Sequence, residues 1–263
     1  MSNYKNKNSV PIIFDRHKIV SKNFDEITLY KNITTEICER LKEIQLSFND
    51  VIEINSKSNY TENIIKNSDK INNFFRTSMH SKSSIENINL VCDEELLPIK
   101  KNSFNLIFSI LGLNLINDLP GTLRQIYNIL KPNGLFLAAF WGQGTLSPLS
   151  ESLAYADEKI LGGLYPRTYP FCDIKTLGNL MQRAGFINPV VDVEKVVYKY
   201  KNIFDIIYDV RKLSEKNILS SRKKSFTPKS IFKEAENYLY KNYSENTEIK
   251  IPYNIIFVSG WKK

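Results

Sequence analysis

The 263-residue sequence has few of the residues that build disulfide frameworks or metal centres. Its three cysteines, Cys38, Cys92 and Cys172, are scattered and odd in number, which argues against a disulfide framework and predicts a reducing compartment, the cytoplasm. Its two histidines, His17 and His80, form no His-x-x-x-His pair, and there is no Cys-x-x-Cys. We therefore expect no metal site.

Long hydrophobic runs are also missing. The longest, Leu135 to Trp141, has the length of a strand and falls short of the roughly 18–20 apolar residues that span a membrane. The opening, Met1 to Ser9, is rich in Lys and Asn without an apolar core, so no secretory signal is expected. With 42% hydrophobic and 12% aromatic residues the chain still has ample material for a core, which excludes global disorder.

Positive charge is in excess and unevenly spread. The net charge is +8, and the segment Lys199 to Glu234 alone holds ten basic and four acidic residues. One interpretation is a patch for nucleic acid, an anionic membrane surface or an acidic protein. The other is a pair of solvated helices, which we favour because the charges are not interleaved with aromatic residues as in RNA-binding sequences.

Hydrophobic patterning predicts strands alternating with helices. Because the strands are continuously apolar, we expect an α/β protein with a mostly parallel sheet covered on both faces. The predicted strands are Phe48–Ile54, Ile71–Arg76, Ile88–Cys92, Phe104–Ile110, Leu135–Trp141, Val190–Tyr198 and Tyr253–Trp261. The predicted helices are Ile27–Ile44, Tyr60–Lys66, Asp118–Leu130, Thr176–Ala184, Ile203–Leu213 and Pro228–Tyr243.

Several motifs follow one another in a familiar order. Asp93-Glu94-Glu95-Leu96-Leu97-Pro98 precedes Leu111–Pro120 and Leu130-Lys131-Pro132-Asn133-Gly134, while Phe14-Asp15-Arg16 opens the chain and Gly260-Trp261-Lys262 closes it. This order resembles the class I S-adenosylmethionine (SAM) methyltransferases. Within them it is similar to the branch of the malonyl-carrier-protein methyltransferases and the complex I assembly factor 5 proteins, the latter known as a protein arginine hydroxylase on a methyltransferase fold.

The resemblance implies a Rossmann-like class I methyltransferase fold with seven strands in the order 3-2-1-4-5-7-6. The last strand, Tyr253 to Trp261, would run antiparallel between the fifth and sixth, and helical lids would follow strands five and six. It also implies one domain over 1–263, comprising an N-terminal arm and helix (1–47), a cofactor-side half (48–141) and a substrate-side half with the lid (142–263). We expect the basic segment Lys199 to Glu234 to be mostly helical and to form this lid.

The cofactor loop departs from the family. The family motif Asp/Glu-x-Gly-x-Gly-x-Gly corresponds here to Glu53-Ile54-Asn55-Ser56-Lys57-Ser58-Asn59, which keeps the acid and none of the glycines. Asn55 and Asn59 are the mildest replacements because asparagine tolerates left-handed backbone. Lys57 is the most disruptive, since its charge would lie beside the sulfonium of SAM.

The other cofactor positions are mixed. The carboxylate that holds the ribose in the family corresponds to Ser78, which cannot form the bidentate, charged contact. Asp93 keeps the adenine position with Glu94 beside it, and Gly112 and Asn114 would line the methyl-transfer face. The expected cofactor-side residues are thus Glu53, Asn55, Ser78, Asp93, Glu94, Gly112 and Asn114. We expect SAM binding to be weak or lost.

On the substrate side, Tyr165, Arg167 and Tyr169 lie in an insert after the fifth strand, where the family closes over its substrate. Arg167 would clamp a carboxylate or phosphate; the favoured alternative is an exposed arginine on a surface loop. Asp15 and Arg16 are expected to pair, either pinning the arm over the pocket mouth or forming a surface ion pair of little worth.

The resemblance and its departures favour a methyltransferase-superfamily protein with a degenerate SAM loop that assists assembly or modification of a client protein, of the respiratory-chain assembly factor type. Two alternatives stay open. One is an active SAM-dependent methyltransferase with an altered loop. The other is a basic protein that binds RNA or a membrane surface through Lys199 to Lys233.

Overall fold

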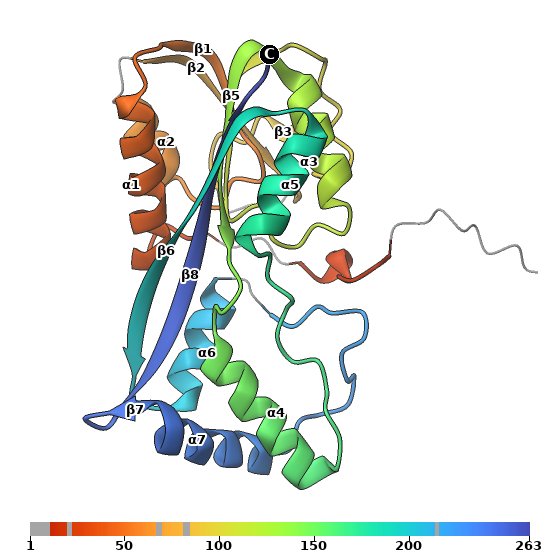
Figure 1. Cartoon of the computed structure of the whole chain (residues 1–263), viewed down its shortest axis with the longest axis vertical. Coiled ribbons are helices and arrows are strands. Elements are labelled where there is room, and N and C mark those ends of the chain that lie inside the picture. The colour runs from red at the N-terminus through yellow and green to blue at the C-terminus, as the bar shows by residue number, and fades with distance from the viewer. Residues whose placement is uncertain (1–10, 20–22, 67–69, 81–84, 214–215) are drawn as a thin grey trace, which may run out of the picture.

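The computed structural model describes residues 11–19, 23–66, 70–80, 85–213 and 216–263. The Lys/Asn-rich opening, Met1 to Ser9, lies outside these ranges. In the described residues one sheet runs from the upper part of the molecule downward, and its longest strands reach a group of helices at the lower end (Figure 1).

Eight strands of the described residues form this sheet, in the order β3-β2-β1-β4-β5-β8-β6, with β7 paired to β8. The strands from β1 to β5 are parallel, and β8 lies antiparallel between β5 and β6. This confirms the predicted order and the antiparallel last strand. The bounds are β1 Phe48–Glu53, β2 Ile71–Ser78, β3 Leu90–Val91, β4 Phe104–Ile110, β5 Leu130–Trp141, β6 Ile187–Tyr200, β7 Ser244–Glu245 and β8 Glu248–Trp261.

Helices cover both faces of the sheet. A short 3-10 turn, η1 (Arg16–Lys18), precedes α1 (Thr28–Glu43), and α1 packs with α2 (Tyr60–Lys66) on one face. The other face carries α3 (Leu119–Ile129) and α5 (Ile174–Ala184). Neighbouring residues of a strand face opposite sides, so Val51 and Ile52 of β1 belong to different core clusters.

Local signals explain several helix ends. Asp118 caps α3 by accepting a 2.9 Å hydrogen bond from the Gly121 amide, with Pro120 in the first turn. Gly185 ends α5 in the left-handed conformation, at φ 105°. Both were expected from the sequence.

The lid lies beyond the carboxyl ends of the parallel strands, where α4 (Ser147–Leu161), α6 (Ile203–Lys212) and α7 (Lys229–Tyr243) gather (Figure 1). The expectation that Lys199 to Glu234 is mostly helical is wrong, because the described residues between α6 and α7 are irregular. Helix α4 was missed, although its buried Leu149, Leu153 and Ala156 have helical spacing.

Candidate functional site

The loop after β1 folds onto the end of β4. Asn55 adopts the left-handed conformation expected of it, at φ 52°, whereas Asn59 does not. The Asn55 side-chain amide donates a 2.9 Å hydrogen bond to the Gly112 carbonyl, and Lys57 donates to the Asn55 side-chain oxygen at 3.0 Å. Gly112 is required here, because a Cβ would lie 2.8 Å from the Ile54 carbonyl oxygen. These contacts close the space between the two strand ends.

A carboxylate of the chain itself occupies the start of α2. Asp25 Oδ1 accepts hydrogen bonds from the backbone amides of Asn59 and Tyr60, at 2.7 and 3.1 Å, and from the Ser58 hydroxyl. Burial tends to raise the pKa of Asp25, but these hydrogen bonds outweigh it and hold the pKa below its usual value. The amides at the helix start, which would otherwise attract an anion, are therefore already satisfied.

Glu53, the acid kept from the family motif, is fully buried. Its Oε2 accepts a 2.7 Å hydrogen bond from the Ser56 hydroxyl, while Oε1 has no hydrogen-bond partner among the described residues. Burial raises the pKa of Glu53 to about 7, and the Ser56 hydrogen bond and the charge of Arg76 oppose the rise. Because the Glu53 side chain is buried and bonded to Ser56, it supports the loop from the interior of the protein.

The Glu53 carboxyl predicts a pH dependence of stability. Folding raises its pKa from 4.5 to about 7, so the native state holds the proton more tightly. Its contribution to the free energy of unfolding is present below pH 4.5 and is lost as the pH rises through 7, by on the order of 3 kcal/mol. In the Glu53→Gln variant the free energy of unfolding, measured with urea, is expected to change less between pH 5 and 8 than in the wild type. Glu26→Gln, which removes an exposed acid, is the control and should keep the wild-type pH dependence. Parallel profiles for the two variants would contradict the assignment.

Ser78 lies at the end of β2, at the position predicted for the ribose. Ser78 is buried, and its hydroxyl contacts the backbone of His80, accepting from the amide at 3.2 Å. Arg76, also buried, donates to Glu62 and to the Ser58 carbonyl, the latter at 3.2 Å. Both side chains thus brace neighbouring loops.

Arg16 of the N-terminal arm fills the place that the sequence assigned to adenine. Its guanidinium bonds to Asp93 at 2.5 Å and to Glu94, and lies 3.2 Å from Glu95. The Arg16 side chain is 8% exposed and that of Glu94 is fully buried, whereas Asp93 is 47% exposed. Burial raises the pKa of Glu94, and the charges of Lys57 and Arg16 counteract this. The expected pairing of Arg16 with Asp15 is wrong, because Arg16 pairs instead with the acidic turn, Asp93 to Glu95.

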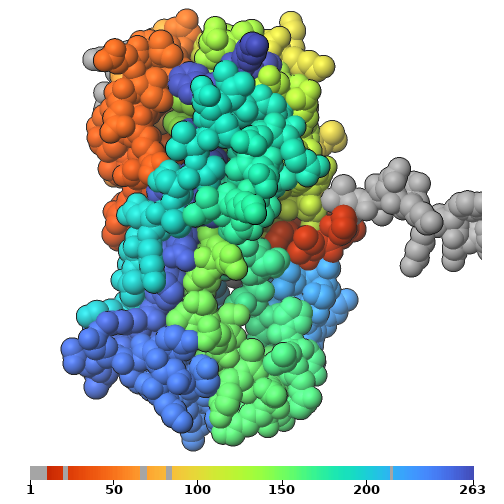
Figure 2. All heavy atoms as spheres, viewed as in Figure 1, coloured from red at the N-terminus to blue at the C-terminus, as the bar shows by residue number. Residues whose placement is uncertain are grey.

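The arm, residues 12–18, is held from both sides. The Asn117 side chain accepts from the amides of Ile13 and Phe14, at 2.9 and 2.8 Å. On the lid side, the Asp15 amide donates to the Ile218 carbonyl at 2.8 Å. Figure 2 shows the arm in red between the light-blue lid segment and the upper part of the molecule. The arm is therefore held by Asn117, Ile218 and the residues that bind Arg16, and not by the predicted pair of Asp15 and Arg16.

The cleft between the ends of β1 and β4 is too small for the cofactor. The cleft, lined by Arg16, Phe24, Asn55, Lys57 and Gly112 among others, has a volume of about 20 Å³. Pockets for small molecules and cofactors measure roughly 300–1,000 Å³. The residues present therefore do not fit SAM in this arrangement.

Asn114 is a structural link. Its side chain donates to the Leu111 carbonyl at 3.1 Å and accepts from the Trp141 amide at 3.0 Å. It therefore joins the ends of β4 and β5, while Gly112 lines the closed cleft.

The substrate-side residues belong to the lid. Arg167 forms a bidentate pair with Asp157 of α4, at 2.5 and 2.6 Å, and donates to Thr227 at 3.1 Å. Its side chain is 16% exposed and that of Asp157 is fully buried, so the favoured interpretation of an exposed arginine is wrong. Tyr169 packs edge-to-face on Phe14, with centroids 5.6 Å apart.

Tyr165 completes this group. Its ring lies under the Lys223 ammonium, 4.3 Å from nitrogen to centroid. In the described ranges no three His, Cys, Asp or Glu residues come together as a metal-binding group. In the same ranges no helix is both long enough and apolar enough to cross a membrane.

The parallel strands and the antiparallel strand inserted between β5 and the edge strand β6 define a class I methyltransferase-type fold. A methyltransferase domain family model matches residues 17–188, and the chain belongs to this family.

Two relatives place the chain within the predicted branch. Human mitochondrial arginine-hydroxylase NDUFAF5 is 31% identical over 241 residues, which cover 89% of this chain and 70% of that protein. A malonyl-[acyl-carrier protein] O-methyltransferase of Nitrosospira multiformis is 26% identical over 170 residues, covering 65% and 53%. The solved YcgJ protein of Bacillus subtilis has a TM-score of 0.57 at 12% identity, covering 87% of this chain and 98% of that one, and it shows the fold alone.

Proposed function

We propose that this chain is a methyltransferase-fold protein with a degenerate SAM site that assists the assembly or modification of a client protein. Two observations carry the proposal: Arg16 is bonded to Asp93 and Glu94, and the cleft that Arg16 helps to line has a volume of only about 20 Å³. A guanidinium between these carboxylates takes the contacts that an adenine would need. The loss of the loop glycines and of the ribose acid acts in the same direction.

The relative named as an arginine hydroxylase supports a client that is a protein. Helix α6 offers a surface suited to one, since Phe204 and Tyr208 lie one turn apart and are 59% and 60% exposed. Exposed aromatic side chains are enriched where proteins bind each other. We propose that the client is a component of the respiratory chain. We also propose that this chain is located in the cytoplasm, as the sequence predicts.

An active SAM-dependent methyltransferase is the second candidate. The observation that favours it is a groove of about 680 Å³ on the outer side of the arm, which Asp93 and His17 help to line. Displacement of the arm would join this groove to the cleft. RNA binding is less well supported, because Arg222 and Lys223 of the basic segment line a cavity within the lid.

Titration calorimetry and a gene deletion together test the proposal. The purified chain is expected to bind SAM with a Kd weaker than about 100 μM, because adenine, ribose and loop contacts are all compromised. In a strain of the source organism without the gene, the amount of assembled complex I on native gels is expected to fall. The wild-type chain should restore it, and Phe204→Asp/Tyr208→Asp should not.

Lys233→Glu is the matched control, since it places an acid on the exposed surface of the neighbouring helix α7. It is expected to restore assembly fully. Micromolar SAM binding by the wild-type chain would replace the proposal by the methyltransferase alternative. Normal assembly of complex I without the gene would refute the respiratory-chain client.

A further inference from the structure

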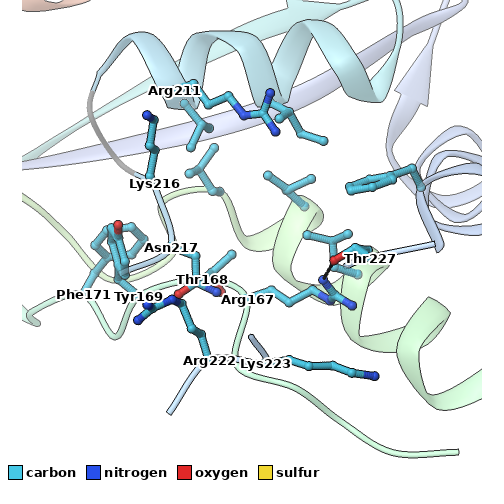
Figure 3. A pocket seen from close by; sticks show the side chains of 16 residues that line it. Arg167, Thr168, Tyr169, Phe171, Arg211, Lys216, Asn217, Arg222, Lys223 and Thr227 are labelled. Carbon is cyan, nitrogen blue, oxygen red and sulfur yellow. Dashed lines mark hydrogen bonds between the residues drawn. The ribbon is translucent and has the colours of Figure 1, made fainter. Parts of the chain in front are cut away.

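The lid contains a second pocket, which we call the lid cavity, with a volume of about 590 Å³. It lies between α4, α6, the start of α7 and the irregular segment that joins α6 to α7, as Figure 3 shows. Its size is within the range of cavities that bind small molecules. It is separate from the closed cleft, with which it shares no lining residue.

The interior of the lid cavity is apolar. Helices α4 and α6 provide aliphatic side chains, and Phe171 and Phe232 add aromatic rings; the aliphatic residues are Leu146, Leu149, Leu153, Ile207 and Val210. This interior therefore suits an alkyl chain, for which each buried methylene strengthens binding about fourfold.

The rim of the lid cavity is strongly basic. Figure 3 shows Arg211 and Lys216 on one side of the apolar side chains and Arg222 and Lys223 on the other. The described lining residues include no Asp or Glu. The charges of two cations at the cavity are matched, since Arg167 pairs with the buried Asp157 and Arg222 pairs with Asp15 at 3.3 Å, which leaves Lys216 and Lys223 to set the potential of the rim. The rim thus keeps a positive potential that favours an anionic group.

We propose that the lid cavity binds a small amphipathic anion, an alkyl chain that carries one carboxylate or phosphate head. The chain lies among the side chains of α4 and α6, and the head lies at the cationic rim. This inference is independent of the SAM cleft, because it uses none of its residues. A carboxylate and a phosphate share the required chemistry, and the experiment separates them.

Calorimetry of the full chain with decanoate and with decyl phosphate, both below their micelle concentrations, tests the proposal. One molecule is expected to bind per chain in a saturable manner, and the ratio of the two affinities identifies the preferred head. Octanoate, two methylenes shorter, is expected to bind about 15-fold more weakly than decanoate. Decyltrimethylammonium, with the same tail and the opposite charge, is expected to bind at least tenfold more weakly than decanoate.

Two pairs of variants assign the binding to the lid cavity. Lys216→Gln/Lys223→Gln is expected to weaken decanoate binding at least tenfold, since contacts to charged groups are lost. Lys229→Gln/Lys233→Gln removes the same charge from the same segment but outside the cavity lining, and should leave the affinity unchanged. Val210→Phe fills the apolar interior, so it should weaken decanoate binding while the melting temperature reports that the fold is intact.

Three results would overturn the proposal. Equal affinity for acetate and decanoate would reveal an ionic patch without a tail site. Equal binding of decyltrimethylammonium would reveal unspecific adsorption. Binding to anionic phosphatidylserine vesicles without saturable binding of the monomeric probes would assign the basic segment to a membrane surface.

Discussion

Replacing Arg16 by alanine is expected to lower the free energy of unfolding by about 3–5 kcal/mol, the usual consequence of removing one partner of a buried ion pair. The reason is Glu94, which is fully buried and would lose its contact with the guanidinium. Urea unfolding at pH 8 measures the loss. It should shrink toward pH 5, because burial already raises the pKa of Glu94 and the unpaired carboxyl would then be protonated.

A double variant separates the lost pair from the lost packing. In Arg16→Met/Glu94→Gln neither charge is left, so the free energy of unfolding should return to within about 1 kcal/mol of the wild type. Lys18→Ala, on the same arm with a side chain 56% exposed, is the control and should cost less than about 0.5 kcal/mol. An equal loss in Arg16→Ala and Lys18→Ala would show that the acidic turn does not hold the arm.

Restoring SAM binding is expected to require both the loop and the arm. The fourfold variant Asn55→Gly, Lys57→Gly, Asn59→Gly and Ser78→Asp supplies the missing family residues. On its own it should keep a Kd above about 100 μM, because Arg16 still lies between Asp93 and Glu94. Adding Arg16→Ala should lower the Kd by about 10²–10³-fold, since two or more polar contacts of about 1–3 kcal/mol each become available.

Arg16→Ala in the wild-type loop is the control for this experiment. This variant frees only the carboxylates that would bind adenine, so its Kd for SAM is expected to stay above about 100 μM. Circular dichroism at the titration temperature verifies that each variant is folded. Low-micromolar binding by the fourfold variant with Arg16 in place would show that SAM displaces the arm unaided.

The helices and strands could be predicted from the sequence because their signals are local, whereas the order of the strands came from the resemblance to a known family. Continuous apolar runs gave β1 and β4, and Asp118 and Gly185 marked helix ends by interactions within a few residues. The irregular part of the lid was not predicted, because its conformation depends on distant partners such as Phe14, which pairs with Leu219. The assignment of the whole chain to a single domain stays a prediction.

The site was predicted less well for the same reason. The left-handed Asn55 follows from the residue type, but the partner of Arg16 lies 77 residues away and no spacing rule reveals it. Likewise, Asp25 has the usual chemistry of a helix cap, yet it caps α2 from 34 residues upstream. Arg167 looked exposed because its partner Asp157 belongs to α4, the helix that was missed.

The attachment of the arm to the lid bears on how the chain matures during synthesis. The Ser220 hydroxyl donates to the Ile12 carbonyl, 208 residues away, at 2.7 Å. A ribosome releases the N-terminus first and adds about 5–20 residues each second, so the arm leaves it long before its lid partners exist. The parallel strands β1 to β5 are therefore synthesised while the lid side of the arm is still unpaired. Closure of the cleft is completed as a late step of biogenesis, once nearly the whole polypeptide has emerged.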